Sequence, residues 1–293
     1  MVADVVLDVG ARLGEGPVWD EQAGELLFVD ILSGTIHGFS PGSGEHRSFE
    51  AGMAVGAVVL DVAGGLVFAG ADGFYSGVGF GGVLSRIGVF GVDATIVRFN
   101  DGKVDPFGRF VAGTMSWSGR GPHGALYLLD TDGSVRELLR QVTVSNGLAW
   151  GDDGRLMYYI DTPTHLVEVF DVDPTTGALA RRRRIAEVDG HPDGMALDDE
   201  GMIWVAVAGG CRVERIDPSS GRRLAVVDVP VSQVTSVAFG GARLNELYIT
   251  TGQGMLAAGR QPAPHAGDLF AVSPGVTGPP AYRYGPKPGF RST

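Results

Sequence analysis

Short apolar runs separated by turn residues follow one another along almost the whole chain. Runs such as LLFVDI (26–31), LMYYID (156–161) and MIWVAV (202–207) are rich in Val, Ile and aromatic residues, and turns containing Asp or Gly precede them. This composition and length are typical of β-strands. No stretch keeps a helical apolar period over about a dozen positions, so little helix is expected.

The apolar runs that follow a glycine recur at a regular spacing. Aligned on this phase, the chain divides into six units whose anchors lie about 40–47 residues apart, the spacing of propeller blades. The anchors are Pro17-Val18-Trp19, Ala57-Val58-Val59, Lys103-Val104-Asp105, Leu148-Ala149-Trp150, Met195-Ala196-Leu197 and Ser236-Val237-Ala238-Phe239. The pattern predicts an all-β, six-bladed β-propeller that forms a single domain over residues 1–293. A two-domain sandwich would not explain the period.

The two ends of the chain are expected to meet in the last blade. A strand over Val5–Val9 would lie beside Ala281–Tyr284, which joins the ends and leaves no exposed sheet edge. The glycine-rich stretch Ser76–Gly91 predicts a mobile or irregular connection near the second blade, at the entrance of any pocket.

Three oxygen-bearing side chains occupy one phase of the repeat, each immediately before a glycine. They are Glu15 in EGPVWD, Asn146 in NGLAWG and Asp193 in DGMALD. The innermost strand of each propeller blade runs along the central axis, so residues at one phase should ring one mouth of the channel. The same phase in the other units holds Val55, Asp101 (with Asn100 beside it) and Thr235.

Two carboxylates and an amide oxygen, with no Cys or His at their phase, make a hard ligand set. Such a set suits Ca²⁺, Mg²⁺ or Mn²⁺, and Zn²⁺ when water completes the shell. Turn capping is the alternative, because Asp and Asn are ordinary turn residues. Glu15 argues against capping, because Glu is a poor turn residue and gains nothing there without a partner.

Composition excludes several classes of partner. The formal net charge of −11 disfavours nucleic acid and acidic membrane surfaces. No apolar run approaches the roughly 20 residues that cross a bilayer. The start has no basic segment before a long apolar run, and the single cysteine, Cys211, cannot form an intrachain disulfide, so a cytoplasmic location is expected. Cys211 itself is expected to be a small core residue rather than a nucleophile.

Two further signals have ordinary explanations. The basic run Arg181–Arg184 follows a turn and predicts a solvated hairpin strand. His191, two residues before Asp193, fits a solvent-facing turn histidine, with contact to a metal ligand or proton transfer as alternatives.

Several long segments together resemble the gluconolactonase family that includes regucalcin (senescence marker protein). They are LGEGPVWD (13–20), RFNDGKVDPFGRFVAGTM (98–115), SNGLAW (145–150), YYIDTPTHLVEVFDVD (158–173), PDGMALDDEGMIWVAVAGGCRVERIDP (192–218) and TSVAFGG (235–241). The resemblance covers nearly the whole chain in order. It implies a six-bladed propeller with a divalent metal in the channel mouth, and hydrolysis of sugar lactones.

Carried over residue by residue, the resemblance makes Glu15, Asn146 and Asp193 ligands of one divalent cation. Ca²⁺ and Zn²⁺ come first, with Mn²⁺ and Mg²⁺ as alternatives. It makes Arg98 and Asn100 substrate contacts, whereas Arg98 by itself would be explained as a solvated strand residue. Asp193 is the candidate general base for a metal-activated water.

One segment departs from the family. After GTM, animal members carry acidic residues, one of which contacts substrate; here Ser116, Trp117 and Ser118 follow, and Ser118 falls at the contact position. The identity of the lactone is therefore open. The predicted function is metal-dependent hydrolysis of a small aldonolactone such as gluconolactone. The alternative is a calcium- or small-molecule-binding propeller without turnover.

Overall fold

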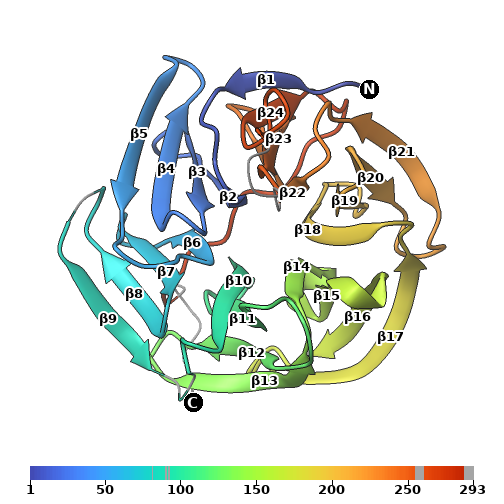
Figure 1. The fold of residues 1–293 in the computed structure, drawn as a ribbon. Helices are drawn as coiled ribbons and strands as arrows, with labels where there is room; N and C mark the ends of the chain where they lie inside the picture. Colours follow the sequence, from blue (N-terminus) through green and yellow to red (C-terminus); the bar gives the residue numbers. More distant parts are fainter. Residues whose placement is uncertain (81, 90, 92, 255–260, 287–293) are drawn as a thin grey trace.

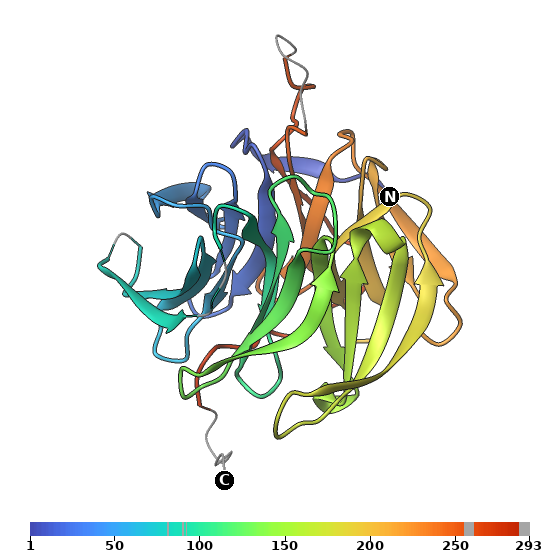
Figure 2. The same cartoon turned by 60° about the horizontal axis from the view of Figure 1, so that its bottom comes forward.

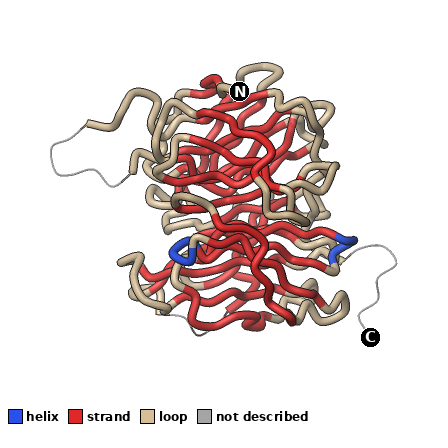
Figure 3. Tube along the Cα trace, turned by 90° about the vertical axis from the view of Figure 1, so that its right-hand side faces the viewer, coloured by secondary structure: helices blue, strands red, loops and turns tan. Residues whose placement is uncertain are grey.

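The computed structural model describes residues 1–293 except 81, 90, 92, 255–260 and 287–293. Six four-stranded antiparallel sheets surround a central channel (Figure 1), and strands dominate the trace in a second view (Figure 3). This confirms the predicted six-bladed propeller.

Each blade takes its strands in sequence order from the channel outward, apart from the last. Blade one consists of β2 (Gly14–Asp20), β3 (Glu25–Asp30), β4 (Thr35–Ser40) and β5 (Glu45–Glu50). Blade two consists of β6 (Ala57–Leu60), β7 (Leu66–Gly70), β8 (Gly73–Gly77) and β9 (Leu84–Val89). Blade three consists of β10 (Val97–Val104), β11 (Phe110–Ser116), β12 (Gly124–Leu129) and β13 (Val135–Val142). Blades four and five consist of β14 (Ser145–Gly151), β15 (Leu156–Asp161), β16 (Leu166–Val172) and β17 (Leu179–Glu187); and β18 (His191–Leu197), β19 (Ile203–Ala208), β20 (Arg212–Ile216) and β21 (Arg223–Asp228).

The sixth blade joins the beginning of the chain to its later part. Its order is β22 (Val234–Gly240), β23 (Glu246–Thr251), β24 (Leu269–Val272) and then β1 (Asp4–Leu7). The first strand therefore does close the last blade, but its expected partner was wrong. Strand β1 pairs with β24, and residues 281–284 lie elsewhere.

Residues 278–285 form a segment that we call the C-terminal strap. Inner strands begin at one end of the channel, the site mouth, and finish at the other, the far mouth. The strap crosses the far mouth from blade six towards blades two and three, as the red trace in Figures 1 and 2 shows. It ends beside β6, where Tyr284 N donates to Leu60 O (2.7 Å) and Val62 N donates to Tyr284 O (2.9 Å).

Apolar layers fill the space between neighbouring blades. Ala149 and Ile160 of blade four pack with Met195 and Val205 of blade five, for example, and all four are buried. The outermost strands, such as β5 and β17, carry exposed polar residues because they face solvent at the rim of the ring. In β17 the run Arg181–Arg184 is exposed, which confirms the predicted solvated strand.

Two sequence predictions fail at the level of local structure. The stretch Ser76–Gly91 is no irregular connection, because it contains the end of β8 and all of β9, although residues 81 and 90 are outside the described part. Cys211 is exposed and has a φ of 55°, so it is a turn residue rather than a core residue. The turn before β20 has two left-handed residues, Gly209 and Cys211.

Helix is nearly absent from the described residues, as predicted. Two single 3-10 turns occur, η1 (Asp152–Gly154) and η2 (Thr162–Thr164). Across the described ranges, no helix has the length and apolar character that crossing a membrane requires.

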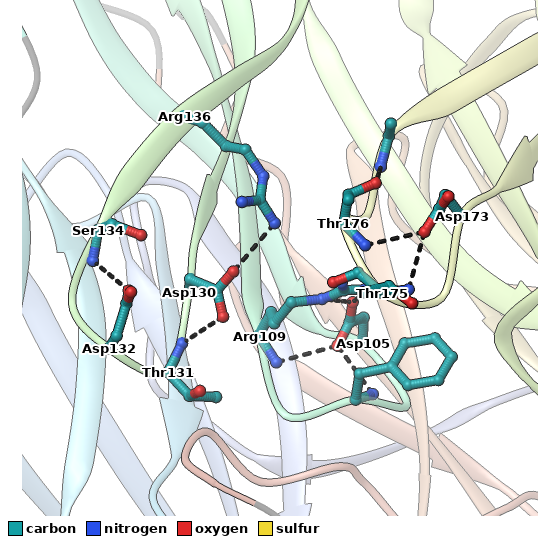
Figure 4. A network of polar contacts seen from close by, with 12 residues as sticks. Asp105, Arg109, Asp130, Thr131, Asp132, Ser134, Arg136, Asp173, Thr175 and Thr176 are labelled. Atoms are coloured by element: carbon teal, nitrogen blue, oxygen red, sulfur yellow. Dashed lines mark hydrogen bonds and ion pairs between the residues drawn. The ribbon is translucent and has the colours of Figure 1, made fainter. Parts of the chain in front are cut away.

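A buried ion pair lies in the β10–β11 turn of blade three near the far mouth, and its arginine also bonds to blade four (Figure 4). Arg109 Nε donates to Asp105 Oδ2 (2.6 Å), and its Nη1 donates to the carbonyl oxygens of Pro174 and Thr175 (3.1 and 3.3 Å). Neither charged side chain is exposed by more than 3%. Because a buried charge is costly without partners, this network fixes the β10–β11 turn against the next blade.

Candidate functional site

A β-bulge near the start of the inner strand accompanies each of the three candidate metal ligands. The strand registers shift between Glu15 and Val18 in β2, between Asn146 and Leu148 in β14, and between Pro192 and Met195 in β18. A bulge bends a strand and redirects the local side chains. The three residues thus lie at bulged strand starts at the site mouth.

The glycine after each of these residues allows the inner strands to crowd together. A Cβ atom on Gly147 would lie 2.7 Å from the carbonyl oxygen of Asp193. A Cβ on Gly194 would lie 2.0 Å from Ser236 Oγ in the next blade. Gly16 has a φ of +52°, which a side chain would strain. The polar–glycine pairs thus reflect close strand approach at Gly147 and Gly194 and a left-handed backbone at Gly16.

Asn146 occupies the centre of a hydrogen-bonded chain across the site mouth. Its Oδ1 accepts from Asn100 Nδ2 (2.9 Å), and its Nδ2 donates to Thr162 Oγ1 (2.7 Å). Thr162 in turn donates to the carbonyl oxygen of Pro192 (2.7 Å), next to Asp193. A carbonyl oxygen has two lone pairs, so Asn146 Oδ1 keeps one for a further partner.

Glu15 and Asp193 form a buried pair of carboxyl groups. The two residues are only 2% and 7% exposed, and Glu15 Oε2 accepts a hydrogen bond from Gly16 N (3.1 Å). Burial raises the pKa of both, and repulsion from Asp193 and Asp101 adds to the rise at Glu15. Such a pair favours a nearby positive charge.

Arg98 supplies part of that positive charge. Burial lowers its pKa to about 10, and the charges of Glu15 and Asp193 oppose this fall, so it stays protonated at neutral pH. Its Nη1 donates to Asn100 Oδ1 (2.6 Å) and to Phe99 O (2.9 Å). Arg98 is therefore no solvated strand residue: the structure places it with Asn100 beside the carboxyl pair.

The residues present fit a hard divalent cation. Asp193 Oδ1 is buried and has no hydrogen-bond partner, which leaves one carboxylate oxygen free for a metal. In the part of the chain that the structure describes, no three His, Cys, Asp or Glu side chains gather as a metal site would require. A cation held by Glu15 and Asp193 would therefore need the amide oxygen of Asn146 as its third protein ligand.

Ser118 lies farther out than the other predicted residues. It is exposed, and its Oγ is 2.9 Å from Ser116 Oγ and 3.5 Å from the carbonyl oxygen of Arg120. The hydroxyl is thus engaged within its own loop. Beside it, Trp117 is 45% exposed, and its ring lies 5.7 Å from Arg98 Cζ.

His191 is exposed, as expected, but it is the first residue of strand β18 rather than a turn residue. Its ring lies 5.4 Å from that of His165, whose Nδ1 contacts Gly190 O. The sequence did not single out Thr162, His165 or Trp117. Thr162 and His165 lie inside the motif YYIDTPTHL, but the repeat phase gives no reason to select them.

Taken together, the fold and the oxygen-lined mouth define a six-bladed propeller with a candidate cation site on its axis. The chain belongs to the SMP-30/gluconolactonase/LRE-like family, whose model matches residues 13–253. It is 41% identical over 275 residues to the "Putative sugar lactone lactonase YvrE" of Bacillus subtilis, covering 92% of this chain and 94% of that protein. It is 42% identical over 280 residues to regucalcin of Danio rerio, covering 93% and 95%.

Solved structures show the same architecture. A luciferin-regenerating enzyme superposes with a TM-score of 0.89 at 30% identity, covering 97% of this chain and 99% of that one. A calcium-binding protein, regucalcin, from Agrobacterium tumefaciens superposes with a TM-score of 0.89 at 26% identity, covering 97% of both chains. A Xanthomonas campestris gluconolactonase, at 24% identity and a TM-score of 0.73 over 94% and 89% of the chains, shares the fold.

Proposed function

We propose that this protein hydrolyses a small aldonolactone, such as gluconolactone, with one divalent cation held by Glu15, Asn146 and Asp193. The observation that carries the proposal is the buried, unpartnered Asp193 Oδ1 beside a second carboxyl group and an amide oxygen. The naming of a Bacillus relative as a sugar lactone lactonase supports the reaction class. The calcium-binding regucalcin supports a divalent cation.

The cation, when bound, would polarise the lactone carbonyl and make a bound water more acidic. Asp193 accepts the proton of the attacking water as the water oxygen bonds to the carbonyl carbon. The ring C–O bond then breaks, and the departing oxygen takes up that proton to give the hydroxy acid. Arg98 donates hydrogen bonds to oxygens of the lactone. Asn100 Nδ2 already donates to Ser145 O and Asn146 Oδ1 (both 2.9 Å), so Asn100 contributes the remaining lone pair of its Oδ1, which accepts from a lactone hydroxyl. The two contacts fix the ring over Asp193.

A pH-indicator assay on chelated protein tests this function. Aldonolactones are offered first without metal and then with Ca²⁺, Zn²⁺, Mn²⁺ or Mg²⁺ restored. Acid release that returns with a cation is the expected result. Cation binding without acid release from any lactone would overturn the enzymatic proposal and leave binding without turnover as the function.

Replacing Asp193 by Ala should remove both a ligand and the base, so metal-dependent turnover should fall by at least about 10³-fold. Calorimetric titration with the same cation should show weakened binding. Activity that survives with the metal still bound would show that another group is the base.

A further inference from the structure

Lys103 crosses the channel beneath the candidate site. It lies on β10 in blade three, and its Nζ donates to the carbonyl oxygen of Met195 on β18 in blade five (2.6 Å). Met195 is two residues after Asp193, so the contact lies directly below that ligand. The side chain is half-buried, and its free part lines a cavity of about 110 Å³.

That cavity separates the site from the strap. Its walls are mainly apolar and include Trp19, Trp150 and Phe239, while Tyr282 of the strap lies at the far mouth. Asp101 and Lys103 are its charged members. An ammonium group in such surroundings is costly unless an opposite charge or a hydrogen bond compensates it.

The five charged groups at this level of the channel divide into two sets. Arg98 interacts with Glu15 and Asp193. Asp101 and Lys103 lie two residues apart on β10, on the same face of the strand, and both line the cavity. Burial raises the pKa of Asp101, and the charge of Lys103 opposes that rise. Burial lowers the pKa of Lys103, and the charge of Asp101 opposes that fall. Asp101 also repels Glu15 and Asp193. Three carboxylates and two cations thus share one poorly solvated volume.

We propose that Lys103 is a positioning residue that cancels the charge of Asp101 beneath the site, so that the affinity for a divalent cation is set by Glu15 and Asp193. This rests on the proposed function, because it assumes that these two residues hold a cation. Charges interact strongly in such an environment, so an uncompensated charge on either member of the pair would change cation affinity. The Met195 carbonyl keeps the ammonium group in place.

A double-mutant cycle separates this charge role from a purely structural one. The variants are Asp101→Asn, Lys103→Met and the double variant, each titrated with CaCl₂ by calorimetry after chelation. Asp101→Asn leaves the charge of Lys103 uncompensated and should weaken Ca²⁺ binding about tenfold. Lys103→Met leaves Asp101 unpaired and should tighten binding about tenfold. The double variant should return to within about threefold of the unchanged protein.

The Nζ contact with Met195 is lost in both Lys103→Met and the double variant, so only charge differs between them. Arg140→Met is the matched control, because it removes an exposed cation from the same blade and should leave Ca²⁺ affinity unchanged. Thermal unfolding without Ca²⁺ checks that every variant is folded.

If both single variants weaken Ca²⁺ binding and the double variant binds Ca²⁺ no more tightly than they do, Lys103 only supports the structure and the inference is wrong. If the single variants do not shift affinity in opposite directions, it is equally wrong. If the unchanged protein binds none of Ca²⁺, Zn²⁺, Mn²⁺ and Mg²⁺, the proposed function fails instead.

Discussion

In the first blade, His37 lies between two other rings. Its ring centroid is 4.8 Å from that of Phe28, and its Nδ1 is 3.1 Å from His46 Nε2. Burial lowers the pKa of His37 to about 4, and repulsion from His46 adds to the fall. The unfolded chain takes up this proton near pH 6.5, so the contribution of His37 to stability is complete above that pH. It is lost progressively as the pH falls towards 4.

Replacing His37 by Phe keeps a ring in the stack and removes the titrating group. Between about pH 7.5 and pH 5, the unchanged protein should lose about 2 kcal/mol more unfolding free energy than the variant. Urea unfolding at the two pH values measures the difference. Equal losses in the two proteins would show that His37 does not titrate as described.

Among single residues, the sequence located Glu15, Asn146 and Asp193 because they share a repeat phase, and the structure brings them to one mouth. Their role as ligands stays a prediction. Ser118 was selected by resemblance alone, and its hydroxyl lies among the groups of its own loop. Side-chain hydrogen bonds of this kind depend on loop geometry, which a repeat pattern does not specify.

At the scale of the strand, the bulged starts of the inner strands depend on the absence of a side chain. Gly147→Ala would place a Cβ 2.7 Å from Asp193 O and 2.9 Å from Ile160 Cδ1. Because a backbone atom is the nearest neighbour, β18 must move. We expect a loss of about 1–3 kcal/mol in stability and weaker Ca²⁺ binding.

Urea unfolding and calorimetric titration check both effects. Gly42→Ala is the control, because no heavy atom lies within 4 Å of its added Cβ. Unchanged Ca²⁺ binding in a destabilised Gly147→Ala protein would show that the close strand approach does not position Asp193.

The turn between β10 and β11 depends on the buried pair in Figure 4. Arg109→Met leaves Asp105 buried without its partner, so the unfolding free energy should fall by about 3 kcal/mol. Chemical denaturation measures this fall. Arg140→Met, which removes an 82% exposed partner of Glu137, should leave the midpoint nearly unchanged. Equal losses of unfolding free energy in the two variants would show that burial does not determine how much the Asp105–Arg109 pair contributes to stability.

For the whole molecule, the strap holds the far mouth closed. Arg283 Nη2 donates to Asp20 Oδ1 (2.5 Å), Tyr284 Oη donates to Asp130 O (2.9 Å), and Gly285 N donates to Gly108 O (3.0 Å). These contacts tie blades one and three to a segment that leaves blade six, and the hydrogen bonds of Tyr284 with Leu60 and Val62 tie blade two to it. The ring is thus closed twice, by β1 in the sheet and by the strap across the axis.

A protein that ends at Thr277 should lose these contacts and unfold at a temperature lower by roughly 5–10 °C. Its Ca²⁺ affinity should stay within about threefold, because the strap lies at the mouth opposite the site. Differential scanning calorimetry and titration separate the two effects. Tyr284→Phe, which removes one hydrogen bond, should give a smaller fall. A large loss of Ca²⁺ affinity in the shortened protein would show that the strap at the far mouth affects cation binding at the site mouth.

The sequence by itself determined the fold class, the number of blades and the residues that face the channel mouth. It could do so because residues at the same phase of a repeat occupy equivalent places in the fold. Short apolar runs of strand length also identify the strands from local sequence alone. Only the tertiary structure decided that β1 pairs with β24, that the strap covers the far mouth, and that Lys103 reaches Met195. These contacts join segments far apart in the chain, and they depend on the close approach of inner strands, which no local pattern encodes.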